Sequence, residues 1–473
     1  MEIKKRKIKF FSFGFVTVST LISSMLHFLL SVYARKFVSV TDYGLFSTCT
    51  LLATYLNYLQ LGILNSYNRD YPQLKGSGEL EKASYLRNTV STLLLCVYFV
   101  VVVLAEVVLF FLYKVIGLDI KLYIGFSIMA PTAFCSVFES YFLISARMDG
   151  YLNKSALAVI IKSVISIVVA LYIIKLFGYI GLYVATPLAS LISVVFLYKV
   201  VIINPKFTFD WKLCKSLIIS GFPLLINSFI WTVVTSIDKF VILAFFDVDA
   251  LGYYSISTLA FSTIVIIPST LSQLFYIKMG EVYGKDKSID SLVNVTNKYS
   301  CLIAFVAGAT VTLLYNILPL FVQIVMPHFM DGIEAAQIIM LGIAFYASSI
   351  LYGNVLTILK LNSQVIKTTI ALCIFNLLIS SGLVLFNHNI VMVALGTSVS
   401  YALYSLLILI KLKQLISIDF FTSIKGSWTP VIIGVLVCAM CYIFNLSYIF
   451  GLVLGVSVYI VFGFIFLKKW RQG

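Results

Sequence analysis

Two adjacent ionisable residues, Asp238 and Lys239, stand inside a long apolar run of this chain. Glu106, Glu139 and Lys162 share that setting. An ionisable side chain at mid-bilayer costs roughly 2.5–3.5 kcal/mol on insertion scales, so such residues are kept where they face a bundle interior or a water-filled cavity. These five residues are therefore our first candidates for a polar site.

Two polar stripes accompany these charges. Asn227 and Asp238 lie with Trp231 and Thr235 at helical spacing on an otherwise apolar segment, and Asn57 belongs to a similar stripe of hydroxyl and amide residues near position 50. We expect both stripes to line one cavity. Two alternatives stay open: hydroxyls and amides can hydrogen-bond between helices without a cavity, and Lys239 can extend to the outer surface.

Other motifs carry less chemistry. The Asp-x-Asp pattern at 247–249 falls in a short predicted outer loop, and His27, His328 and His388 lack ligand spacing. The chain contains no P-loop and no nucleophile elbow. We therefore expect no metal, no cofactor and no catalytic residue.

The composition indicates that these residues lie on membrane-spanning helices. The 473 residues are 61% hydrophobic and 11% charged, whereas soluble domains average about 25% charged. A membrane-spanning helix needs roughly 20 mostly apolar residues, and such runs follow one another along the chain. We predict an all-α polytopic membrane protein with fourteen helices near 10–34, 43–64, 89–113, 121–146, 155–175, 178–202, 217–245, 250–275, 298–325, 333–358, 365–386, 390–410, 427–444 and 447–468.

The lysines and arginines set the orientation. With the N-terminus inside, 27 lie in inner segments, 5 in outer segments and 2 within helices. This bias follows the positive-inside rule and predicts that both termini are cytoplasmic. The net charge of +15 then reflects topology and contact with anionic membrane lipids, and no nucleic-acid partner is expected.

An internal repeat divides the helices. An offset of 208 residues aligns Gly44 with Gly252 and Ser47 with Ser255, among other matches. Parallel repeats of transporters place their substrate between two halves. We predict a six-helix lobe at 1–210, a second six-helix lobe at 211–414, and two additional helices at 415–473.

Several motifs together resemble one family. The segments are "SGFPLLINSF" at 220–229, "SIDKFVI" at 236–242, "LGYYSIS" at 251–257, "DYGLFS" at 42–47, "LGILNSYNRDYP" at 61–72 and "FGYIGLYVATPLAS" at 177–190. They resemble bacterial polysaccharide transporters and O-antigen flippases of the multidrug/oligosaccharidyl-lipid/polysaccharide exporter superfamily. The resemblance spans nearly the whole chain.

The resemblance implies two six-helix lobes in a V, as in multidrug exporters of this superfamily. It implies a flippase that moves an undecaprenyl-pyrophosphate-linked oligosaccharide to the outer leaflet of the bacterial inner membrane, coupled to a proton or sodium gradient. A polysaccharide polymerase and a chain-length regulator are the implied protein partners. The family aspartate is usually followed by arginine, whereas Lys239 follows Asp238 here and offers a point charge instead of a bidentate fork.

The predicted site follows from both lines of reasoning. A polar headgroup needs a wet, cation-lined route, for which the chain offers Arg35, Lys36, Lys162 and Lys239. Asn57, Asn227 and Asp238 complete the expected lining, and Glu106, Glu139 and Asp238 are the candidates for ion coupling.

One pair allows a sharper expectation. Glu139 and Lys162 each lie eight residues from the inner end of consecutive antiparallel helices, roughly 12 Å deep. We therefore predict that they can form an ion pair, although depth alone does not fix the direction in which each points.

Two other functions remain open. A multidrug cation antiporter would share the fold, but its cavity should be anionic or apolar. A membrane polymerase or ligase would need a large outer loop with catalytic Arg or His, and the predicted outer loops are short and poor in both.

Overall fold

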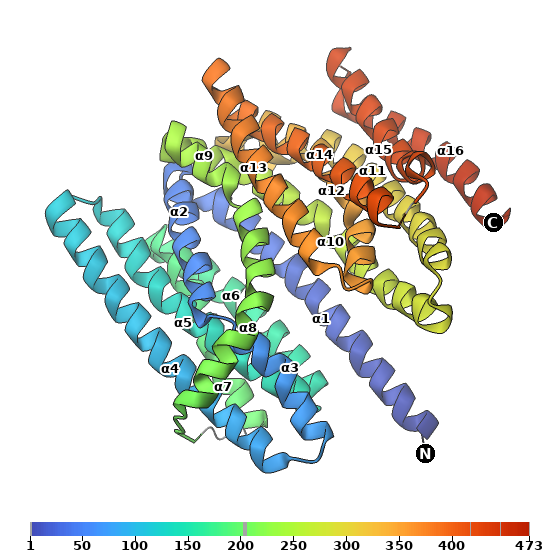
Figure 1. Cartoon of the computed structure of the whole chain (residues 1–473). Coiled ribbons are helices and arrows are strands. Elements are labelled where there is room, and N and C mark those ends of the chain that lie inside the picture. Colours follow the sequence, from blue (N-terminus) through green and yellow to red (C-terminus); the bar gives the residue numbers. More distant parts are fainter. Residues whose placement is uncertain (1, 202–205, 417, 445, 473) are drawn as a thin grey trace. The chain divides into compact units, whose positions relative to one another are not determined.

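Nearly all of the described residues are helical (Figure 1). The computed structural model describes residues 2–201, 206–416, 418–444 and 446–472, and no β-strand occurs within these ranges. The predicted all-α class is therefore confirmed. Eleven of the described helices are long and apolar enough to cross a membrane, or twelve if α8 (Trp211–Val234) is counted as one bent span.

The helices form two compact units, Met1–Phe229 and Ile230–Gly473, with the boundary inside α8. The helices that lie wholly in the first unit are α1 (Glu2–Phe37), α2 (Val40–Leu56), α3 (Ile63–Gly76), α4 (Leu80–Phe111), α5 (Ile120–Met148), α6 (Leu152–Phe177) and α7 (Ile180–Val201). A 3₁₀ turn, η1 (Asn57–Gln60), separates α2 from α3, and a π turn, η2 (Leu112–Ile116), follows α4.

The second unit carries the remaining helices. These are α9 (Ile237–Phe245), α10 (Val248–Asp286), α11 (Ile289–Val325), η3 (Pro327–Gly332), α12 (Ile333–Ile358), α13 (Asn362–Phe386), α14 (Ile390–Ile416), α15 (Phe420–Ile443) and α16 (Tyr448–Gln472). The division into lobes at 1–210, 211–414 and 415–473 stays a prediction.

For two of the fourteen predicted helices, the prediction of one continuous helix is wrong. The segment predicted over 43–64 consists of α2, η1 and the start of α3, and the segment predicted over 217–245 is divided into α8 and α9. Both breaks lie within apolar sequence and lack the charged loops by which helix ends were located. The count of fourteen spans stays a prediction, since it requires each broken pair to cross as one span.

The internal repeat is visible in the helix ends. α1 ends at Phe37 and α9 at Phe245, while α2 begins at Val40 and α10 at Val248, so both boundaries recur after 208 residues. Each second helix also begins with a side-chain cap, from Ser39 in one copy and Asp247 in the other. The copies then differ, because α10 runs on without interruption where α2 breaks.

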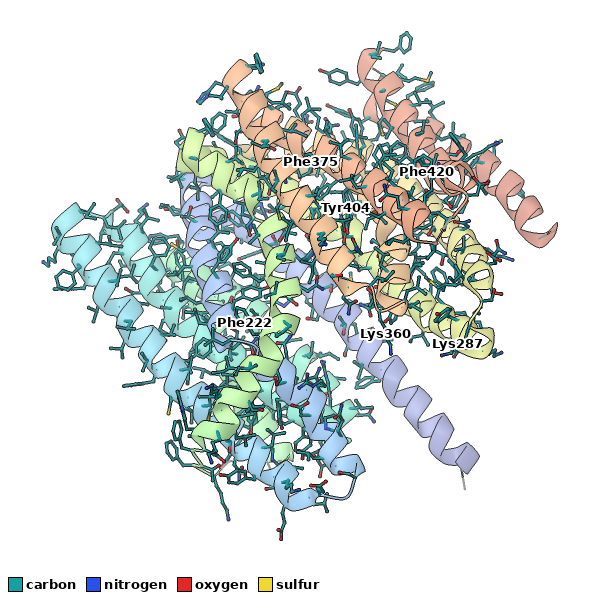
Figure 2. The ribbon with its side chains drawn as sticks, viewed as in Figure 1. Phe222, Lys287, Lys360, Phe375, Tyr404 and Phe420 are labelled. Carbon is teal, nitrogen blue, oxygen red and sulfur yellow. The ribbon has the colours of Figure 1, made fainter. Side chains whose placement is uncertain are left out.

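The side chains agree with a membrane setting. α4 exposes a continuous apolar face that includes Phe99, Val103 and Val107, as expected for contact with lipid. In the second unit, α12 and α14 approach closely where Gly342 packs against Ser398, as small residues allow between membrane helices. Lys287 and Lys360 lie at the α10–α11 and α12–α13 turns (Figure 2).

Candidate functional site

The break between α8 and α9 positions Asp238 and Lys239. α8 ends at Val234, and the Ser236 amide donates to the Val233 carbonyl at 3.0 Å in a tightened turn. α9 then begins at Ile237, so Asp238 lies in its first turn. Backbone N–H groups at a helix N-terminus favour a carboxylate, and this partly offsets the cost of burying Asp238.

Asp238 is buried, with 6% of its surface exposed. One carboxylate oxygen accepts a hydrogen bond from the Tyr254 hydroxyl of α10 at 2.8 Å, and the other oxygen has no partner among the described residues. A carboxylate left half-satisfied in an apolar setting has capacity for a proton or a small cation.

Lys239 is half-buried beside this carboxylate. Its ammonium makes no hydrogen bond and no ion pair with any described residue, although Asp238 precedes it in sequence. Both residues face a cavity of about 190 Å³ whose lining is Thr235, Asp238, Lys239, Thr258, Phe261, Ile339 and Tyr401. An unpaired ammonium in a cavity that two threonines also line can bind an anionic oxygen.

The predicted pair in the first unit is present. The Lys162 ammonium of α6 lies 2.5 Å from a carboxylate oxygen of Glu139 on α5, and the Glu139 side chain is almost completely buried. The expectation from equal depth is therefore confirmed. Close by, the hydroxyls of Ser23 on α1 and Ser163 on α6 lie 2.6 Å apart, which links α1 to the same helix.

Arg35 and Lys36 have different environments at the end of α1. Arg35 is 2% exposed, donates to the Ser31 carbonyl at 2.9 Å, and stacks its guanidinium 4.2 Å from the centre of the Tyr43 ring. Lys36 is exposed. The buried cation of this pair is therefore Arg35.

The predicted stripe on the seventh helix includes residues of both units. Thr235, Asp238 and Lys239 line the cavity of the second unit, whereas Asn227 is exposed and lines none of the described cavities. The expectation of one continuous polar face stays a prediction, since α8 ends at Val234 and Asp238 and Lys239 belong to α9.

The remaining candidates lie in the first unit. Asn57 begins η1 and accepts a hydrogen bond from Ser136 at 2.8 Å through its side-chain oxygen. It lines a separate cavity of about 270 Å³. Glu106 is half-buried on α4 and makes no hydrogen bond or ion pair with a described residue.

Two features were missed from the sequence. Tyr254 falls inside a motif already singled out, and its hydroxyl holds Asp238. Asp149, at the α5–α6 turn, accepts from Lys75 at 2.8 Å, from Arg87 at 2.9 Å and from the Tyr71 hydroxyl at 2.8 Å. This Asp149 cluster joins α3 and α4 to the turn. Positive charges in an inner segment indicated topology, but nothing marked their common partner.

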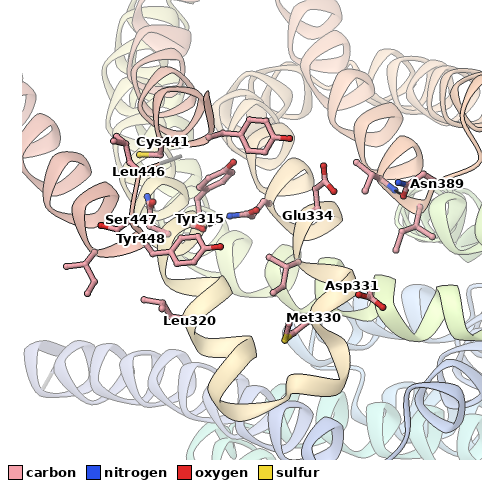
Figure 3. Close-up of a pocket in the computed structure, with 17 residues that line it drawn as sticks. Tyr315, Leu320, Met330, Asp331, Glu334, Asn389, Cys441, Leu446, Ser447 and Tyr448 are labelled. Atoms are coloured by element: carbon pink, nitrogen blue, oxygen red, sulfur yellow. Dashed lines mark hydrogen bonds between the residues drawn. The ribbon is translucent and has the colours of Figure 1, made fainter. Parts of the chain in front are cut away.

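The largest cavity described lies in the second unit and has a volume of about 1010 Å³. Tyr315 and Tyr448 lie on one side of it, and Asp331 and Glu334 on the other (Figure 3). Its lining contains no Lys, Arg or His. The sign of its charge suits a cation and disfavours a pyrophosphate.

Known structures share this arrangement of helices. Lipid II flippase MurJ in an inward closed conformation has a TM-score of 0.74 at 15% identity, over 96% of this chain and 99% of MurJ. An inward-facing multidrug resistance MATE family transporter of the MOP superfamily has a TM-score of 0.70 at 14% identity, over 84% and 94%. A MATE structure in complex with MaL6 has a TM-score of 0.60 at 15% identity, over 86% and 96%. No curated protein matches the chain.

The fold therefore defines a multi-pass membrane protein whose helices are arranged as in MurJ and MATE transporters, as expected from the motifs. The model of the polysaccharide biosynthesis protein family matches residues 12–277, more than half of the chain. The chain belongs to the polysaccharide biosynthesis protein family.

Proposed function

We propose that this protein is a flippase for an undecaprenyl-pyrophosphate-linked oligosaccharide, such as an O-antigen or capsule repeat unit. It moves this substrate from the cytoplasmic to the outer leaflet of the bacterial inner membrane. Alternating access, driven by an ion gradient, carries the headgroup across, and both termini are cytoplasmic. A polysaccharide polymerase and a chain-length regulator receive the product.

The observation that carries this proposal is the unpaired ammonium of Lys239 in a cavity within an apolar unit. A half-buried cation without a protein partner is unfavourable in an apolar setting, and an anionic substrate group offsets that cost when it binds. The family adds polysaccharide biosynthesis as the setting, and the fold is one in which MurJ flips a lipid-linked precursor.

Asp238 is the proposed coupling residue. Its free carboxylate oxygen lies in the same cavity as Lys239, so binding of a proton or sodium ion there changes the local charge that an anionic substrate meets. Arg35 and Lys162 are already held by Tyr43 and Glu139. Arg35 and Lys162 contribute positive electrostatic potential, and Lys239 is the residue proposed to contact the phosphate directly.

Reconstituted vesicles test the function directly. Undecaprenyl pyrophosphate carrying a fluorescent oligosaccharide is placed in both leaflets, and an impermeant quencher reports the share that remains outside. Wild-type protein should exchange the probe between leaflets, and empty vesicles should not. Protein that inserts normally but leaves the probe static would refute the proposal.

A second function is favoured by the acidic, tyrosine-lined cavity of about 1010 Å³ (Figure 3). Carboxylates and aromatic faces bind organic cations, as expected for a multidrug antiporter. Ethidium efflux from cells that express the protein distinguishes the two. Efflux that is lost in Glu334→Gln would support the antiporter, whereas absence of efflux together with lipid exchange in vesicles supports the flippase.

A further inference from the structure

The second helix of the first unit, α2, ends at a strained turn. α2 ends at Leu56, η1 follows, and α3 begins at Ile63. Leu61 has a φ of 53° and Gly62 a φ of 84°. A left-handed backbone is unfavourable for a residue such as leucine and persists only where the surroundings impose it.

Neighbouring side chains provide hydrogen-bond partners for backbone groups that the break leaves without helical partners. The Tyr98 hydroxyl lies 3.0 Å from each of the Leu56 and Asn57 carbonyls, and the Gln60 side-chain oxygen accepts from the Leu64 amide at 3.0 Å. Freed backbone groups within a membrane must find such partners. Hydrogen bonds from the Tyr98 and Gln60 side chains therefore stabilise the interrupted backbone.

The break opens a cavity whose lining carries no charge. It has a volume of about 270 Å³ and is lined by Thr54, Asn57, Tyr58, Gln60, Asn65, Leu225 and Ser228. Six of these seven residues carry an amide or a hydroxyl group. The cavity is smaller than the roughly 300–1,000 Å³ of pockets for drug-sized ligands, so it accommodates only a small part of an oligosaccharide.

Much hydrogen-bonding capacity in this cavity is unused. The Asn65 amide makes no hydrogen bond with any described residue. Asn57 and Gln60 each use the side-chain oxygen, toward Ser136 and the Leu64 amide, and their NH₂ groups have no described partner. Polar side chains of this kind within a membrane are expensive unless they are bonded, which points to a polar occupant.

The repeat shows that the shared fold does not require this cavity. At the offset of 208 residues, Asn57 corresponds to Val265 and Gln60 to Pro268, and α10 passes this level as one helix. Only the first copy has the break and the amides of Asn57 and Gln60, whereas Asn65 corresponds to Gln273. Their presence there calls for a role beyond helix packing.

We propose that this cavity binds an uncharged, hydroxyl-bearing sugar ring of the transported glycan, an inference that rests on the proposed flippase function. Amides donate to and accept from hydroxyl groups without a charge to desolvate, and the Tyr58 ring offers an apolar face for the ring carbons. Asn57 follows a helix of 17 residues, about 26 Å along α2. If α2 starts at the outer surface, the cavity lies in the inner half of the membrane, where the glycan enters.

Binding to the full-length protein in nanodiscs tests this assignment. The probes are undecaprenyl pyrophosphate carrying a trisaccharide of neutral hexoses, and bare undecaprenyl pyrophosphate. Asn65→Ala removes a hydrogen-bonding amide and should weaken binding of the glycosylated probe about three- to tenfold, while the bare carrier binds as before. Asn65→Asp, which keeps the shape but loses the donors, should also weaken the glycosylated probe.

Asn68→Ala is the matched control, because Asn68 lies one turn further along α3, is exposed and does not line the cavity. It should leave both affinities unchanged. Equal effects of Asn65→Ala on both probes, or no effect on either, would overturn the sugar site. Wild-type protein that binds neither probe would instead count against the flippase function itself.

Discussion

Replacement of Lys239 distinguishes two roles for this side chain, contact with the substrate and extension to the membrane surface. A point charge should be replaceable by another cation, so Lys239→Arg should retain surface polysaccharide. Loss of a charged hydrogen bond should lower affinity about tenfold or more, so Lys239→Ala should reduce polysaccharide and Lys239→Glu should abolish it. Surface polysaccharide is measured at matched protein levels in the membrane, with the exposed Lys287→Ala as the control.

A well-expressed and fully active Lys239→Glu variant would show that this side chain does not contact phosphate. Its ammonium would then extend to the membrane surface, and the unpaired carboxylate oxygen of Asp238 would stay as the polar feature of that cavity.

The Glu139–Lys162 pair should behave as one unit. Removing one partner strands a buried charge, at a cost of ~3–5 kcal/mol. Glu139→Gln and Lys162→Met should each lower the melting temperature of the purified protein, and the double variant should recover much of the loss. A double variant no more stable than the worse single variant would show that the pair contributes no coupling.

Sequence reasoning reached this pair but not the partner of Asp238. Depth along two helices joined by a short turn follows from counting residues, which is why Glu139 and Lys162 could be matched. The bond from Tyr254 to Asp238 depends on the direction of a helix after a break within apolar sequence. No glycine or proline marks that break, and the adjacent charges of Asp238 and Lys239 do not show that the helix is interrupted before them.

At the scale of elements, the start of α3 depends on two glycines. A Cβ on Gly62 would lie 2.3 Å from the Gly221 carbonyl carbon, and one on Gly221 would lie 2.0 Å from the Gly62 oxygen. We expect Gly221→Ala to lower the melting temperature and to reduce transport, because the added methyl group would force α3 and α8 apart. Gly76→Ala is the control, since its Cβ would meet nothing within 4 Å.

A Gly221→Ala protein with unchanged melting temperature would show that α8 can shift without cost. The seryl contacts beside the glycines would then have to move as well, since Ser66 donates to the Leu217 carbonyl at 2.7 Å. Hydropathy predicted the two helices but not this contact, because close backbone approach depends on tertiary packing.

The Asp149 cluster gives a second prediction at this scale. Asp149→Asn should lower the melting temperature, because Lys75 and Arg87 lose a shared counter-charge that ties α3 and α4 to the α5–α6 turn. Salt should weaken the wild-type contribution, since these side chains are partly exposed. Identical salt dependence in the variant and the wild-type protein would argue against the cluster as a stabilising element.

For the whole molecule, the distribution of lysine and arginine predicts the orientation in the membrane. Alkaline phosphatase fused after Ala250 should be active, and fused after Lys285 it should be inactive, because α10 connects the two positions. The reverse activities would invert the map. Composition and charge sufficed to predict the class and the order of helices, whereas the two breaks and the number of crossings depend on packing inside the membrane.

The length of α10 and α11 has a practical consequence for imaging. Helices of 39 and 37 residues extend for roughly 55–60 Å, well beyond a hydrocarbon core about 30 Å thick. They meet at a turn that contains Lys287 and Ser288 (Figure 2). A helical fusion partner inserted at that turn would continue both helices. It would give this 52.8 kDa protein a rigid marker for particle alignment in electron cryo-microscopy.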